Sequence, residues 1–148
     1  MHDNPTAERQ DWMRLLSTAP LAMLEAWGGT RQDAHTWLRR PETGLVMVRG
    51  RIGATGNRFN LGEMTLTRCT LRLVSGEHGV AYVQGRSSRK AELAALADAL
   101  LQSAAARAEV ERDLLQPLRA RRAVDAARRA QAARNTKVDF LTIARGDE

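Results

Sequence analysis

Three observations predict an α+β fold in which a four-stranded antiparallel meander is packed with helices. Residues 1–30 carry helix-start and helix-stop signals, residues 34–86 alternate apolar and polar side chains between turn residues, and residues 87–134 repeat apolar residues at helical spacing. A chain of 148 residues is long enough for one domain with a modest core. We therefore expect a single domain over residues 1–148, with residues 135–148 forming a C-terminal tail.

The first thirty residues are predicted to form a helical hairpin. Asn4 can cap the free amides of a first helix, and Pro5 tolerates the first helical position. A break is expected near Pro20, after which a second short helix ends at Gly28 and Gly29. Paired glycines at this place are typical of a left-handed C-terminal cap.

Four strands are expected in the central part of the chain. The first covers residues 34–40, a turn at 41–44 leads to the second at 45–52, and the third and fourth cover 63–74 and 80–85. In the third strand the apolar residues change from even to odd positions. This change of phase indicates either a bulge near Thr67 and Arg68 or a strand buried on both faces.

The glycine loop, residues 53–62, separates the second and third strands. Three glycines in ten residues allow positive φ angles and close approach by another group. The loop lacks the Gly-Lys-Ser/Thr ending of a P-loop and leads into a strand, so a phosphate site there would use a loop nest with Arg58 or Arg68. The alternative is a structural or subunit-contact loop. The candidate phosphate or partner contacts are Gly53, Thr55, Gly56, Arg58, Thr67, Arg68, Gln84 and Arg86.

The helical part of the chain divides into a core helix and an arm. Ser87 or Ser88 can cap a helix whose leucines and alanines form a stripe that covers one face of the sheet. A break is expected at Gln116, because Pro117 would kink a continuous helix.

Beyond Pro117 the predicted helix carries alanine where a core helix would carry leucine. Alanines bury too little apolar area to anchor a long helix, at about 25 cal/mol per Å², so an extended helical arm that packs against a partner is favoured. The apolar tail that follows also favours a covered surface. The candidate partner contacts are Arg121, Arg128, Val138, Phe140, Leu141, Ile143 and Arg145.

The chain is basic, with 23 Lys and Arg against 17 Asp and Glu and a formal net charge of +6. Residues 118–137 hold seven basic residues and one acidic residue, so electrostatic binding of RNA or DNA is one reading. Against that reading, no aromatic residue lies among these arginines and no nucleic-acid motif is present. A subunit interface accounts for the alanines, the arginines and the apolar tail together.

Cysteine and histidine usage favours neither an internal disulfide nor a metal site. Cys69 is the single cysteine, and its place in an apolar strand indicates a buried thiol rather than a nucleophile. His2, His35 and His78 are far apart and lack metal-ligand spacing. With no signal peptide and no run of about 18 apolar residues, we expect a cytoplasmic protein without a membrane partner.

Several ordered segments resemble the G subunit family of the bacterial carbon-phosphorus lyase system, PhnG. The segments are Arg9-Gln10 with Trp12-Met13; residues 42–46; Gly53, Thr55-Gly56, Arg58-Phe59 and Gly62; residues 65–68 and 83–86; Ala91-Glu92, Ala95-Leu96 and residues 98–100; and residues 138–140 with 145–147. They span nearly the whole chain in the family's order, and the Arg/Ala-rich residues 119–134 resemble it least.

The resemblance implies an obligate subunit without catalytic residues of its own, in a core complex that breaks down organic phosphonates under phosphate limitation. The family's reaction transfers the ribose triphosphate of ATP to a phosphonate and releases adenine. The implied partners are the I subunit most directly and the H and J subunits, with two copies of this chain in each complex. Iron-sulfur, S-adenosylmethionine and metal chemistry is expected only in partner subunits, and no cofactor in this one.

Two other functions stay open at this point. The first is a direct catalytic or phosphonate- and ATP-binding role through Arg58, Arg68 or Arg86, because arginine commonly holds phosphate by charge-assisted hydrogen bonds. The second is the nucleic-acid binding described above.

Overall fold

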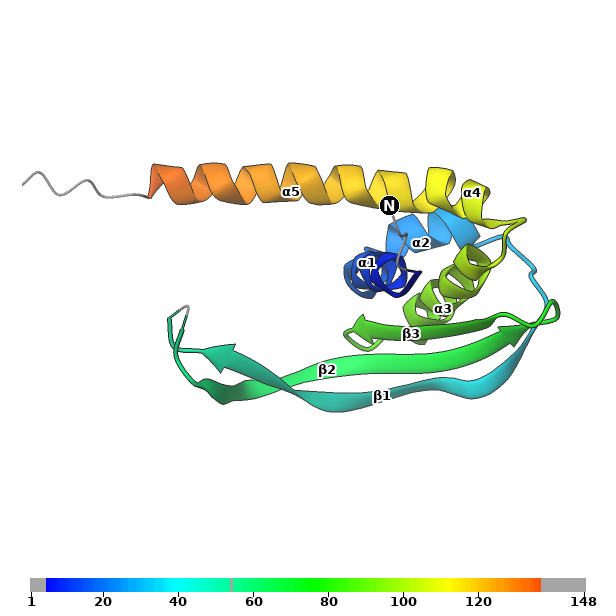
Figure 1. Cartoon of the computed structure of the whole chain (residues 1–148), viewed down its shortest axis with the longest axis horizontal. Helices are drawn as coiled ribbons and strands as arrows, with labels where there is room; N and C mark the ends of the chain where they lie inside the picture. The colour runs from blue at the N-terminus through cyan, green and yellow to red at the C-terminus, as the bar shows by residue number, and fades with distance from the viewer. Residues whose placement is uncertain (1–4, 54, 137–148) are drawn as a thin grey trace, which may run out of the picture.

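The computed structural model describes residues 5–53 and 55–136. The elements are α1 (Pro5–Thr18), α2 (Leu21–Gly28), β1 (His35–Arg51), β2 (Arg58–Leu73), β3 (His78–Gln84), α3 (Ser88–Gln102), α4 (Arg107–Val110), the π-helical turn η1 (Glu111–Leu115) and α5 (Gln116–Asn135). Figure 1 shows α1, α2 and α3 on one face of the sheet and α4 to α5 above them. The helix α5 and the β1–β2 hairpin project in the same direction from this compact part.

The α+β class is confirmed, but the four-stranded meander is wrong. In the described residues the sheet has three antiparallel strands in the order β1-β2-β3. The turn expected at 41–44 is absent, because β1 continues through it. Pro41 lies where the register shifts between Arg39, which pairs with Thr70, and Glu42, which pairs with Arg68. Proline lacks an N–H, and a strand irregularity tolerates that loss.

The apolar residues of β2 change from even to odd positions because they lie on two different faces of the strand. Pairing of β2 with β3 is unbroken from Leu66 to Arg72, so no bulge lies at Thr67 and Arg68. Odd-numbered residues such as Cys69 and Leu71 are buried under the helices, whereas Leu66 is half-buried and belongs to the alternate set of residues. The irregularity lies in the partner strand β1, opposite Cys69.

Two helices form near the N-terminus, but they are not a hairpin packed mainly on itself. Both α1 and α2 pack on α3, and α1 also packs on β3. The expected left-handed cap is also wrong: Gly29 has φ −62°, and its N–H donates to Glu25 O at 2.7 Å, which continues the helical geometry.

The helix α3 is the centre of the core, as its apolar stripe predicts. Ten of its residues are buried, and five of these are alanines. The N-terminal cap is Ser87, whose hydroxyl accepts a hydrogen bond from Lys90 N. A Cβ on Gly79 of β3 would lie 1.9 Å from Ala95 O. Small residues on both elements therefore allow the helix to lie directly on the strand.

A buried carboxylate joins α1, α3 and β3. Asp98 of α3 is fully buried, and its two oxygens accept four hydrogen bonds. Arg9 donates from Nε at 3.1 Å and Nη2 at 2.8 Å, Trp12 donates from Nε1 at 2.8 Å, and Val80 donates its backbone N–H at 2.9 Å. A buried charge is tolerated when it is paired and hydrogen-bonded in this way.

The break expected at Gln116 is replaced by a π-helical turn. In η1 the chain stays helical, and the N–H of Gln116 donates to Glu111 O, five residues earlier. Because this turn contains one extra residue, the chain stays helical through Pro117. Val110, Leu114, Leu115 and Leu118 are buried and fix the root of α5 on the core.

Replacing Asp98 by alanine is expected to lower the free energy of unfolding by about 3 kcal/mol, because Trp12 and Val80 lose their acceptor in the interior and Arg9 loses its ion pair. Urea denaturation at low protein concentration, followed by tryptophan fluorescence, measures this. The control is Asp11→Ala, which removes a half-exposed carboxylate on α1 and should cost less than about 1 kcal/mol. Equal effects of the two substitutions would contradict the structural role of Asp98.

Candidate functional site

Two segments project from the compact part and are largely exposed. The hairpin arm is residues 44–62, and the helical arm is residues 119–135. Beyond Leu118 every residue of α5 is exposed except Asp125, which is half-buried. In Figure 1 both arms extend past the compact part on the same side. Neither arm has a core of its own.

The hairpin arm exposes large apolar side chains. Leu45, Met47, Ile52 and Leu61 are each more than half exposed, and Phe59 is 41% exposed. Single exposed apolar residues are ordinary, but a group of five on one projecting hairpin indicates a surface that another molecule covers.

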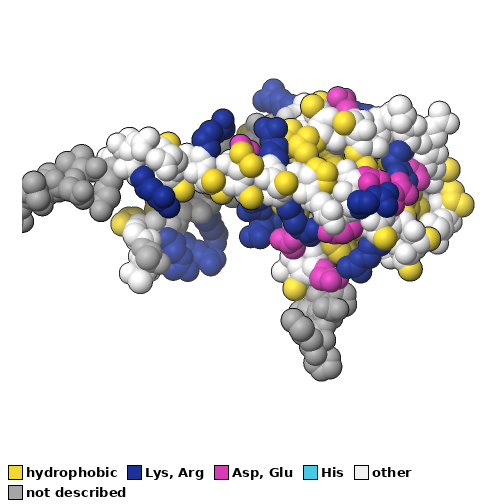
Figure 2. Space-filling view, turned by 90° about the horizontal axis from the view of Figure 1, so that it is seen from above, with side chains coloured by type: hydrophobic (Ala, Val, Ile, Leu, Met, Phe, Trp, Pro, Cys, Tyr) yellow, Lys and Arg dark blue, Asp and Glu magenta, His cyan; other side chains and the backbone are white. Residues whose placement is uncertain are grey.

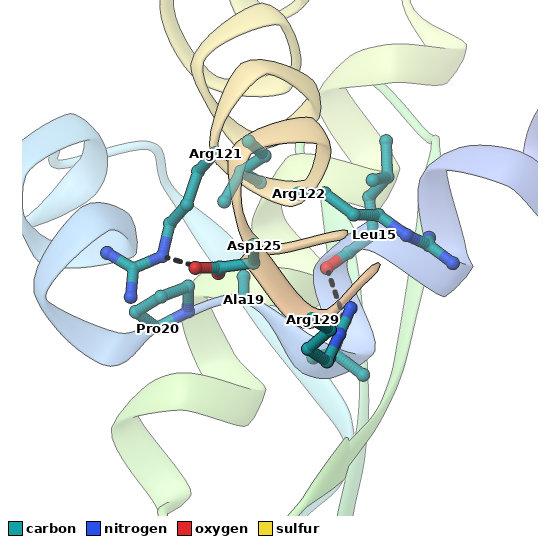
Figure 3. Close-up of a pocket in the computed structure, with 9 residues that line it drawn as sticks. Leu15, Ala19, Pro20, Arg121, Arg122, Asp125 and Arg129 are labelled. Atoms are coloured by element: carbon teal, nitrogen blue, oxygen red, sulfur yellow. Dashed lines mark hydrogen bonds and ion pairs between the residues drawn. The ribbon is translucent and has the colours of Figure 1, made fainter. Parts of the chain in front are cut away.

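The root of the helical arm borders a pocket of about 360 Å³ against the end of α1 (Figure 3). Its apolar lining comes from Leu15, Ala19, Pro20 and Leu118, and its charged rim comes from Arg121, Arg122, Asp125 and Arg129.

Asp125 of the rim lies 3.6 Å from Arg121 and 3.6 Å from Arg128, the second of which is outside the pocket lining. Such exposed pairs contribute little to stability. The partner contacts proposed at Arg121 and Arg128 lie on an open helix surface.

Both arms are basic. The hairpin arm contains three arginines and no acidic residue, and the helical arm contains six arginines and one acidic residue, Asp125. Figure 2 shows acidic side chains mainly over the compact part, whereas basic ones lie both over that part and along α5. The arms together therefore present a cationic surface with apolar residues among the charges.

The glycine loop is a tight turn at the tip of the hairpin. It is shorter than the expected residues 53–62, because β1 ends at Arg51 and residues 58–62 belong to β2. Gly53 has φ +60°, a value that favours glycine, and Gly56 N–H donates to Ile52 O at 3.0 Å. Thr55 is exposed beside them. Gly53 and Gly56 thus have a clear role in backbone geometry.

Thr67 has a structural role. Its side chain is fully buried, its Oγ1 donates to Gly85 O at 2.7 Å, and it lies 3.0 Å from Thr43 Oγ1. These contacts join β2 to β1 and to the residue that follows β3, and they use the hydroxyl that a ligand would need.

Arg68 is engaged by a carboxylate. Its Nε donates to Glu42 Oε1 at 2.6 Å, and Arg39 donates to the same oxygen at 3.0 Å. The hydrogen bond from Arg68 lowers the pKa of Glu42, and Arg39 adds to that effect. An incoming phosphate would have to compete with Glu42 for Arg68.

Arg58 lies far from the other two candidate arginines. Arg58 and Arg68 are ten residues apart on the same strand, which at about 3.3 Å per residue separates them by about 33 Å. Arg86 follows Gly85, whose N–H donates to Thr65 O, so it lies near the middle of β2. Gln84 is exposed and pairs with Leu66. One small substrate cannot contact Arg58 and Arg68 together in this conformation.

The remaining candidate contacts, Val138, Phe140, Leu141, Ile143 and Arg145, lie outside the described residues. Sequence reasoning also missed the joint role of Arg9, Trp12 and Asp98. An aspartate within the apolar stripe of a core helix was the available signal, because a buried carboxylate requires donors.

Cys69 is buried in the described core. Burial raises the pKa of its thiol to about 12, and Glu92 adds to the shift. Among residues 5–53 and 55–136, no three His, Cys, Asp or Glu side chains gather as a metal site would require. No helix in those ranges has the length and apolar character needed to span a membrane.

Comparison with known proteins gives a full-length match. The model of the family described as phosphonate metabolism protein PhnG matches residues 7–146. A curated relative from Rhizobium meliloti (strain 1021), alpha-D-ribose 1-methylphosphonate 5-triphosphate synthase subunit PhnG, is 45% identical over 148 residues. The alignment covers 99% of this chain and 94% of the relative.

Cys69 is expected to resist alkylation in the folded protein. With a pKa near 12, the thiolate fraction at pH 8 is about a thousandfold lower than for a thiol with a pKa near 9. Iodoacetamide labelling followed by mass spectrometry should therefore be slow in buffer and fast in urea. Rapid labelling of the folded protein would contradict the buried assignment and reopen a nucleophilic role.

Proposed function

Because the chain belongs to the PhnG family of phosphonate metabolism proteins, we propose that it is a non-catalytic, obligate subunit of a ribose 1-methylphosphonate 5-triphosphate synthase complex. In this role it supports transfer of the ribose triphosphate of ATP to a phosphonate, with release of adenine, during phosphonate catabolism under phosphate limitation. The observation that carries the proposal is the match over 99% of the chain to a protein named as a subunit of that synthase.

The geometry of the described residues supports a binding role. Arg58 lies far from Arg68, the hydroxyl of Thr67 is hydrogen-bonded to Gly85, Arg68 is paired with Glu42, and Cys69 is a buried thiol. In contrast, the two arms carry exposed apolar and basic side chains away from the core. A surface of this composition suits association with another protein, since apolar contacts supply affinity and arginines supply specific pairing.

The proposed partner is the I subunit, which contacts the glycine-loop sheet and the C-terminal arm, with the H and J subunits completing the complex. We place two copies of this chain in each complex and place the complex in the cytoplasm. The iron-sulfur, S-adenosylmethionine and metal chemistry belongs to the partner subunits in this proposal.

The chain expressed alone is expected to aggregate or to be unstable, and with the I subunit it should co-purify in a stoichiometric complex. Uncovered arms without a core explain both results. A pull-down through a tag on this chain, followed by size-exclusion chromatography, makes the measurement. A well-folded monomer that ignores the I subunit would overturn the proposal.

The same pull-down tests the tail. Deletion of residues 138–148 should abolish assembly, because it removes the apolar side chains of Val138, Phe140, Leu141 and Ile143. A matched control changes Asp147 and Glu148 to alanine and should assemble normally. Unchanged yield of the truncated chain would remove the tail from the interface.

The rival function, direct binding of phosphonate or triphosphate, makes a different prediction. Replacing Arg58, Arg68 or Arg86 one at a time by alanine should leave both assembly and turnover within about twofold of wild type under our proposal, because Arg58 lies far from the other two and Arg68 is paired with Glu42. Adenine release from ATP in the assembled complex measures turnover. Intact assembly with turnover reduced a hundredfold would support the rival.

An electrophoretic retardation assay distinguishes nucleic-acid binding from the subunit role and from direct phosphonate binding. A nucleic-acid protein would shift RNA or DNA at low salt, with a steep salt dependence.

A further inference from the structure

The outer edge of β1 has no partner strand in the described structure, and its free hydrogen-bonding groups can be assigned. The N–H of Gly85 donates to Thr65 O, so the backbone of Thr65 faces the β3 side of β2. Backbone direction alternates along a strand, so Met64 and Leu66 face β1. Their partners Val46 and Gly44 face β2 in return. The intervening residues Thr43, Leu45 and Met47 therefore direct their N–H and C=O groups away from the sheet.

This edge segment, residues 43–48, lacks the usual protection of a free strand. Its sequence Thr-Gly-Leu-Val-Met-Val contains no charge and no proline, and its pairing with β2 is regular from Glu42 to Val48. Leu45 and Met47 are more than half exposed, and Val46 in the alternate set is 36% exposed. Natural proteins normally blunt such an edge or cover it, because an open, flat, apolar edge pairs with other chains.

We propose that the edge segment receives an extended strand from a partner subunit, with apolar residues at the centre of that strand and acidic residues at its ends. The arginines on β1 define these ends: Arg39 and Arg40 precede the segment, with Arg39 paired to Glu42 beside it, and Arg49 and Arg51 follow it. The strand adds to the sheet through main-chain hydrogen bonds, while side chains select the sequence. This inference rests on the proposed function, because it names the chemistry of the partner that the subunit binds.

A hollow beside the edge segment gives the added strand a place for a side chain. It has a volume of about 320 Å³ and is lined in part by Gly44, Val46, Leu66 and Tyr82, with Glu42 and Arg68 at its polar side. Gly44 contributes no side chain that would fill this space, and nothing lies within 4 Å of the position that its Cβ would take. An apolar side chain of the incoming strand fits the chemistry of this lining.

A second copy of the chain paired antiparallel about Leu45 is a poor occupant of the same edge. Antiparallel self-pairing about Leu45 would set Arg39 of one copy opposite Arg51 of the other, twice by symmetry. Like charges in directly opposed positions destabilise a strand pair. A partner with acidic residues at these positions would form opposite-charge pairs instead.

Hydrogen exchange in the assembled complex tests the proposal without any substitution. The complex is captured through a tag on this chain, and amide exchange is followed by NMR or by mass spectrometry with residue resolution. Leu45 and Met47 should exchange at least about a hundredfold more slowly than Thr55 in the exposed turn, and comparably to Val46, which already pairs with β2. Exchange of Leu45 and Met47 as fast as that of Thr55 would overturn the proposal.

Proline substitution tests the same hydrogen bonds by assembly. Leu45→Pro with Met47→Pro removes two outward N–H groups but leaves those that pair with β2, a placement that edge strands tolerate. The matched control, Leu45→Thr with Met47→Thr, keeps both N–H groups. We expect partner binding to fall about tenfold to a hundredfold for the proline pair and less than about threefold for the threonine pair.

The outcomes separate this inference from the function on which it rests. Equal losses for the proline and threonine pairs, or protection that comes from a second copy of this chain, would overturn strand addition and leave subunit membership intact. No capture of any partner by the wild-type chain would overturn the proposed function itself.

Discussion

The carboxylate of Asp98 is the interaction on which the rest of the structure depends. It lies at the meeting point of three elements that are far apart in sequence, and it takes donors from α1 and β3 while belonging to α3. An unpaired charge at this depth would be costly, so the position of α1 over the sheet edge is fixed by chemistry as well as by packing. Leucines alone would permit sliding between these elements, whereas four directed hydrogen bonds allow one arrangement.

That fixed centre explains how the molecule can carry two long extensions. The helix α5 is held at its root by Val110, Leu114, Leu115 and Leu118, and the hairpin is held by the hydrogen bonds of Thr67 to Thr43 of β1 and to Gly85, directly after β3. Past these points the arms are secured by their own backbone hydrogen bonds and by few tertiary contacts. The protein therefore consists of a rigid base with two surfaces whose apolar side chains have no counterpart within the described chain.

Helices with a clear apolar repeat or a capping residue could be predicted from the sequence. Elements whose conformation depends on pairing between strands could not. Ser87 and the leucines of α3 correctly predicted the helix and its burial against the sheet. Pro41 and Gly44 indicated a turn, but the long partner strand β2 holds them in one strand, because tertiary pairing overrides local turn preference. Pro117 indicated a break, and a single π-helical turn absorbed it instead.

For the candidate site, the glycines at the turn and the arginines of α5 were identifiable, but the engagement of Thr67 and Arg68 by their neighbours depends on strand register, which the sequence did not specify.

The positive charge of the two arms comes from arginine alone. All nine basic residues of the two arms are arginine, and neither arm contains lysine. Guanidinium stays protonated at every physiological pH, and it is not a target of lysine acetylation. The positive charge of these surfaces is therefore constant across changes in acidity and in acetyl-group supply. Among ordinary solution conditions, ionic strength remains as the variable that weakens contacts made by these arginines, through screening.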